Sequence, residues 1–66
     1  MEILLNGETQ QLPESATAAD LVDSLGLGGR RYAMEVNGEL LPKSLHAGHV
    51  LKPGDRVEIV HAVGGG

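Results

Sequence analysis

Short apolar runs alternate with glycine-containing turns along most of this chain. The first run ends at Asn6-Gly7, and residues 9–12 can return as a second strand before Pro13. An Asn-Gly pair favours the type I′ turn, whose twist matches that of two paired strands. The pattern therefore predicts a β-hairpin over residues 2–12.

The next segment has the periodicity of a helix. Its apolar side chains recur at the spacing of one helix face, at Ala18, Leu21, Val22 and Leu25. Thr17 is a good N-cap, and Asp20 stands three residues later to complete a capping box. Gly26 stands where a left-handed C-terminal cap is favoured. We expect a helix over about residues 17–25.

The second half of the chain repeats the strand-and-turn pattern. In order, we expect a strand over residues 32–36, a type I′ turn at Asn37-Gly38, a short strand over residues 39–41, a loop with one helical turn over residues 43–51, and a last strand over residues 56–63. Lys52-Pro53-Gly54-Asp55 introduces that last strand, with Pro and Gly at positions that β-turns favour.

These elements predict an α+β fold. One helix packed across one face of a mixed sheet of about five short strands is a stable two-layer solution. A hairpin followed by a helix is how a β-grasp (ubiquitin-like) domain begins, and in that arrangement the last strand lies in the sheet centre beside the first. The last strand is suitably rich in β-branched residues. We expect the helix to contact Ile3, Leu5, Val57 and Ile59.

The sheet face opposite the helix is a candidate docking surface. Side chains alternate between the two faces of a strand, so Glu58, Val60 and Ala62 should point away from the helix. Exposed apolar groups beside the chain terminus are typical of an interaction site. The alternative is the ordinary β-propensity of an open sheet face.

Composition argues against several classes of function. The net charge of −4 disfavours nucleic-acid binding. The chain has no cysteine, and therefore neither a disulfide nor a thiol nucleophile. The N-terminus does not resemble a signal peptide, and no apolar run is long enough to span a membrane, so we expect a soluble cytoplasmic protein.

Neither metal binding nor catalysis is expected of this chain alone. His46, His49 and His61 lack the additional ligands that a zinc site needs, so we predict no metal site. The sequence contains no paired-carboxylate or Ser/His/Asp signature. A chain of 66 residues also leaves little room for a substrate pocket beside a complete core.

The chain ends in three glycines, which weaken a strand and are costly to order. They suit a tail that enters a narrow site on another protein, because residues without a Cβ allow close walls. The carboxylate of Gly66 is a poor acyl donor, but adenylation would convert it to a mixed anhydride that a sulfur nucleophile can attack. We therefore divide the chain into a domain over residues 1–63 and a flexible tail over residues 64–66, in which Gly64 and Gly65 enter the partner's site. The alternative is an ordinary frayed terminus.

Four segments together resemble the sulfur carrier proteins of thiamine biosynthesis: Met1–Gly7, Val36–Glu39, Leu51–Val63 and the tail Gly64–Gly66. That family has a ubiquitin-like β-grasp fold and a final Gly-Gly pair. The resemblance implies that an ATP-dependent adenylyltransferase, related to ubiquitin-activating enzymes, adenylates Gly66. It implies that a cysteine desulfurase persulfide supplies the sulfur and that thiazole synthase receives it from the thiocarboxylate.

In that cycle ATP and a divalent metal belong to the partner enzyme, and this chain binds no cofactor stably. The free chain is expected to be a monomer.

Two other functions fit parts of the pattern. The small subunit of molybdopterin synthase carries the same thiocarboxylate, although that family is usually longer and richer in aromatic residues. The second alternative is a non-catalytic β-grasp interaction module, whose tail is inert and undergoes no reaction.

Overall fold

The computed structural model describes residues 1–61. Its elements in chain order are β1 (Glu2–Leu5), β2 (Glu8–Gln11), α1 (Ala18–Ser24), β3 (Tyr32–Val36), β4 (Glu39–Leu40), the 3₁₀ helix η1 (Lys43–Gly48) and β5 (Arg56–His61). The predicted helical turn within the loop after β4 is therefore confirmed, as η1. The strand predicted over residues 56–63 is described as far as His61. Residues 62–66, which include the predicted tail, lie outside the described residues.

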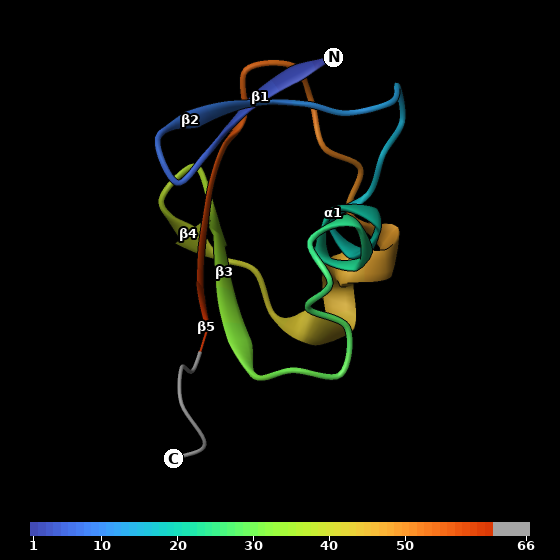
Figure 1. The fold of residues 1–66 in the computed structure, drawn as a ribbon, viewed down its shortest axis with the longest axis vertical. Helices are drawn as coiled ribbons and strands as arrows, with labels where there is room; N and C mark the ends of the chain where they lie inside the picture. Colours follow the sequence, from blue (N-terminus) through green and yellow to red (C-terminus); the bar gives the residue numbers. More distant parts are fainter. Residues whose placement is uncertain (62–66) are drawn as a thin grey trace.

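One mixed sheet contains all five strands, in the order β2-β1-β5-β3-β4. The central strand β5 runs parallel to β1 and antiparallel to β3. Helices α1 and η1 lie on the same side of the sheet (Figure 1). The predicted α+β class and β-grasp arrangement are confirmed, including the position of the last strand beside the first. None of the helices within residues 1–61 has the length and apolar character needed to cross a membrane.

Both Asn-Gly pairs form the turns predicted for them. Asn6 and Gly7 have φ values of 51° and 83°, and Asn37 and Gly38 have φ values of 53° and 84°. Two successive residues with positive φ define the type I′ turn, and asparagine and glycine tolerate that left-handed conformation better than other residues. The two hairpins, β1–β2 and β3–β4, are therefore fixed by local sequence.

The helix begins at the predicted capping box. The Asp20 backbone N–H donates to Thr17 Oγ1 at 3.1 Å, and the Thr17 N–H donates to Asp20 Oδ2 at 2.9 Å. After α1 the chain turns through Gly26, whose φ is 72°. The Leu27 N–H donates to the Val22 carbonyl and the Gly26 N–H to the Asp23 carbonyl, which is the Schellman pattern of helix termination.

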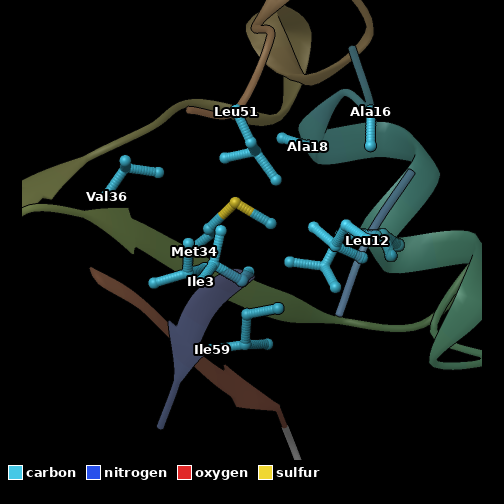
Figure 2. Close-up of a cluster of buried hydrophobic side chains, with 11 residues drawn as sticks. Ile3, Leu12, Ala16, Ala18, Met34, Val36, Leu51 and Ile59 are labelled. Atoms are coloured by element: carbon cyan, nitrogen blue, oxygen red, sulfur yellow. The ribbon is translucent and has the colours of Figure 1, made fainter. Parts of the chain in front are cut away.

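The core lies between the sheet and the two helices. Figure 2 shows side chains from α1, from the strands and from the segment after η1 meeting around Met34. The side chains of Ile3, Leu21 and Val57 are at most 1% exposed. The predicted contribution of Ala18, Leu21 and Val22 to the core is confirmed, as is that of Ile3, Val57 and Ile59. Leu5 is half-buried and packs against this core.

One member of the predicted helix face is wrong. Leu25 continues the helical period in sequence, but its side chain is 37% exposed. Because α1 ends at Ser24, Leu25 is the C-cap residue and its side chain lies at the exposed end of the helix. The Schellman turn instead returns Leu27 to the core, where it is partly buried. Such an apolar contact after the turn commonly accompanies this motif.

Candidate functional site

Strand β5 separates a buried face from an exposed one along the residues that lead to the tail. Val57 and Ile59 point into the core and are 1% and 6% exposed. Arg56, Glu58 and Val60 alternate with them and are exposed. The prediction that Glu58 and Val60 face away from the helix is confirmed. Ala62, Gly64, Gly65 and Gly66, which were predicted to take part in docking or chemistry, lie outside the described residues.

The exposed side of the sheet combines apolar and acidic groups. Val60 of β5 lies opposite Ala33 of β3, and Glu58 lies opposite Glu35. Leu40 of the edge strand β4 lies on the other side of Glu35. The side chains of Val60 and Leu40 are 72% and 67% exposed. We refer to the residues Ala33, Glu35, Leu40, Glu58 and Val60 as the outer face.

The two acidic residues of the outer face are direct cross-strand partners. Glu35 and Glu58 occupy the same register position on neighbouring antiparallel strands, and both are exposed. Like charges placed directly opposite each other destabilise a sheet, whereas opposite charges stabilise it. The free domain therefore carries a small repulsion here, which a positively charged group outside the domain would relieve. Sequence alternation identified Glu58, but only the strand register identifies Glu35.

A recess opens beside the last described residue of β5. Its volume is about 200 Å³, and its lining comprises Leu5, Asn6, Leu25, Leu27, Ile59 and His61. The exposed Leu25 and the turn residue Asn6 both contribute to this lining. Two hydrogen bonds join the Asn6 side chain to the backbone of Ile59. Sequence reasoning identified Asn6 only as a turn residue.

A second polar contact, between His46 of η1 and Tyr32 of β3, lies away from the recess. His46 is 4% exposed; its Nε2 lies 2.9 Å from the Leu41 carbonyl oxygen and its Nδ1 lies 2.8 Å from the Tyr32 hydroxyl. A carbonyl oxygen only accepts, so Nε2 carries a proton, and in the neutral ring Nδ1 accepts from Tyr32. One ring nitrogen thus joins η1 to β3, and the other joins it to the segment between β4 and η1.

Tyr32 has a second neighbour and a perturbed hydroxyl. The Lys43 Nζ lies 5.1 Å from the centroid of the Tyr32 ring, within the range of a cation–π contact. Burial raises the pKa of the Tyr32 hydroxyl above its ordinary value, and the Asp23 carboxylate raises this pKa further. The hydroxyl is therefore held in its protonated form, as its hydrogen bond to His46 requires.

The three histidines do not assemble a metal site in the part of the chain that is described. Within residues 1–61, no three side chains of the His, Asp and Glu types lie close enough to hold an ion together. His46 uses both nitrogens internally, and His61 lies at the end of β5 beside the recess.

Comparisons with known proteins agree on one family. The model of the ThiS family matches residues 3–66. The sulfur carrier protein ThiS of Escherichia coli is 26% identical over 66 residues, which cover both chains completely. A crystal structure of a thiamine biosynthesis protein (ThiS) from Geobacter metallireducens superimposes with a TM-score of 0.83 at 29% identity, and it also covers both chains completely.

The chain also matches part of a larger protein. A thiazole synthase of Paramagnetospirillum magneticum is 39% identical over all 66 residues, which make up 20% of that protein. A thiazole synthase of Magnetococcus marinus is 33% identical, again over 20% of its length. The chain thus spans about one fifth of the length of these two relatives.

Proposed function

This chain is a member of the ThiS family, and from that premise we propose that it is a sulfur carrier for thiamine biosynthesis. The observation that carries the proposal is the match of the family model through Gly66. The end-to-end match with the sulfur carrier of Escherichia coli supports it. In this proposal the chain is a co-substrate of partner enzymes and not itself an enzyme.

The proposed chemistry takes place at the carboxylate of Gly66. One carboxylate oxygen attacks the α-phosphate of ATP on an adenylyltransferase, pyrophosphate leaves, and an acyl adenylate forms. The terminal sulfur of a cysteine desulfurase persulfide then attacks the carbonyl carbon and displaces AMP, which gives an acyl disulfide. A second thiol, from the partner enzyme or an added thiol reductant, attacks the S–S bond, takes the other sulfur into a new disulfide and leaves the thiocarboxylate on Gly66. ATP and a divalent metal are bound by the adenylyltransferase. Gly64 and Gly65 occupy its narrow entrance.

The outer face is the proposed docking surface for the adenylyltransferase. Val60 and Leu40 offer exposed apolar area on either side of the paired carboxylates of Glu35 and Glu58. A basic side chain on the partner would relieve the repulsion between these carboxylates and fix the register of docking. Ala62, two positions after Val60, is proposed to extend the same surface toward the tail.

Thiazole synthase is the proposed acceptor of the sulfur. Two proteins named thiazole synthase contain a segment that matches this entire chain. A carrier segment and a synthase in one polypeptide are held at a high effective concentration, which is useful when one acts on the other. The names of the matching relatives favour this acceptor over molybdopterin synthase.

The test is ATP–pyrophosphate exchange with the adenylyltransferase encoded beside this gene or, failing that, with a thiamine-pathway adenylyltransferase. Deleting Gly66 should abolish exchange, because the new carboxylate falls about 3.5 Å short of the α-phosphate. Gly65→Val should also fail, because a branched side chain stiffens the backbone and blocks a narrow entrance. The described core is formed by residues 3–59, so both variants should keep the melting temperature of the intact chain.

Mass spectrometry supplies the second readout. With ATP, a persulfide donor and the adenylyltransferase, the intact chain should gain the mass that replaces one oxygen by sulfur. If the chain lacking Gly66 supports exchange as well as the intact chain does, the terminal carboxylate is not the activated group. The inert interaction module then becomes the better account.

A further inference from the structure

Strand β5 has unequal support on its two sides near the tail. β3 pairs with it as far as His61, whereas the register with β1 ends at Val57. Figure 1 shows β5 continuing past the turn of the β1–β2 hairpin, with β3 still beside it. Within residues 1–61, the backbone of Ile59 therefore faces no strand on the β1 side.

The side chain of Asn6 occupies that vacant position. The Ile59 N–H donates to Asn6 Oδ1 at 2.9 Å, and Asn6 Nδ2 donates to the Ile59 carbonyl oxygen at 3.2 Å. The Asn6 backbone N–H donates to the Val57 carbonyl oxygen at 2.9 Å. A primary amide offers a donor and an acceptor as a peptide group does, so Asn6 adds one more rung to the ladder after its own backbone has turned away.

We propose that Asn6 is a positioning residue for sulfur transfer: its amide fixes the course of β5 at Ile59 and so sets the direction in which the chain leaves the domain toward Gly66. This inference rests on the proposed function. Beyond Asn6 on this side, His61 borders the recess of about 200 Å³. Among the described residues, Asn6 is thus the last group to hold β5 from the side of β1.

A matched residue at the other end of β5 separates positioning from stability. Asn37 has nearly the same backbone conformation and also precedes a glycine in a type I′ turn. Its Oδ1 accepts from the Arg56 N–H at 2.9 Å, and its Nδ2 donates to Asp55 Oδ1 at 3.1 Å. Each asparagine therefore accepts from a backbone N–H of β5, Asn6 at Ile59 and Asn37 at Arg56, whereas the second bond of Asn6 goes to a backbone carbonyl and that of Asn37 to a carboxylate side chain.

The experiment compares Asn6→Gly with Asn37→Gly. Glycine keeps the left-handed turn without strain, so each variant loses only its side-chain bonds. Exchange kinetics are measured with the adenylyltransferase at a temperature where circular dichroism shows both variants to be folded. Asn6→Gly should lower kcat about tenfold, since a shift of the reacting group by about 1 Å can cost up to 100-fold.

The loss of activity in Asn6→Gly should appear in kcat and not in KM. The outer face remains paired with β3 in Asn6→Gly, so KM should stay within about twofold of the intact value. Asn37→Gly should keep both kcat and KM within about twofold. Asn6→Asp retains the acceptor for the Ile59 N–H and tolerates the turn, so it should recover part of the lost kcat.

Two results would overturn the inference while leaving the proposed function intact. One is an unchanged kcat in Asn6→Gly, and the other is an equal loss of kcat in both glycine variants, which would indicate general destabilisation. If the intact chain itself supports no exchange, the proposed function is wrong, and this inference, which rests on it, is wrong as well. The behaviour of the intact chain thus distinguishes the two failures.

Discussion

Two leucines four positions apart, one within α1 and one at its C-cap, provide a direct test of the packing. Leu21 is fully buried, whereas Leu25 is 37% exposed at the helix C-cap. Leu→Ala removes about three carbon groups, each worth about 0.8 kcal/mol when buried. Leu21→Ala also leaves a cavity, so the expected loss of unfolding free energy is about 2–5 kcal/mol. Leu25→Ala should cost roughly 1–1.5 kcal/mol, because its site is partly in water and can refill with solvent.

Thermal unfolding followed by circular dichroism measures the difference. In a domain of this size each kcal/mol shifts the melting temperature by about 4–8 °C, so Leu21→Ala should melt at least about 2 °C below Leu25→Ala. Leu and Ala both have high helix propensity, so the change in propensity contributes little to either variant. Equal melting temperatures would mean that Leu21 is not the buried anchor of α1, and the register of the helix on the sheet would be wrong.

Two further predictions concern the outer face and Tyr32. Val60→Lys should fold normally but raise the KM for adenylation, whereas Thr9→Lys, an exposed control on β2, should not; equal KM values would remove Val60 from the interface. Because the pKa of Tyr32 is raised in the folded state, its contribution to stability is complete below about pH 10 and is lost as the pH rises through the folded pKa. Urea unfolding between about pH 8 and pH 11 should therefore show a steeper alkaline loss for the intact chain than for Tyr32→Phe, and parallel curves would contradict the assignment.

Local patterns predicted the elements because the forces that form them are local. The Asn-Gly turns and the Thr17–Asp20 capping box involve residues no more than three positions apart. Burial of one face of β5 is enough to determine the alternation of buried and exposed residues over Val57–Val60. The error at Leu25 has the same origin: periodicity gives the spacing of apolar residues, but it does not show that a Schellman turn brings Leu27, two residues after the C-cap, to the core instead.

Contacts between residues far apart in the chain could not be predicted from the sequence. Asn6 and Ile59 are 53 positions apart, and only the parallel pairing of β1 with β5 brings them together. The hydrogen bond between Tyr32 and His46 likewise requires η1 to fold back against β3. The opposition of Glu35 and Glu58 depends on an exact strand register, which hairpin turns fix for β4 but not for β5.

The central position of β5 explains how a small domain can hold a chain terminus for a partner. Chain ends usually fray, but β5 lies between β1 and β3 as far as Val57, stays paired with β3 as far as His61, and buries Val57 and Ile59. Ordering the backbone of one residue costs roughly 1–2 kcal/mol. Pairing with β3 offsets this cost as far as His61, so in the proposed function a partner that binds Gly66 would have to offset it only for the residues after His61. Because Glu58 and Val60 lie on the same strand, contacts at the outer face also restrict where the chain leaves the domain. In the proposed function, docking and delivery of the terminal carboxylate would therefore be coupled through one strand, which among residues 1–61 is last supported on the β1 side by the side-chain amide of Asn6.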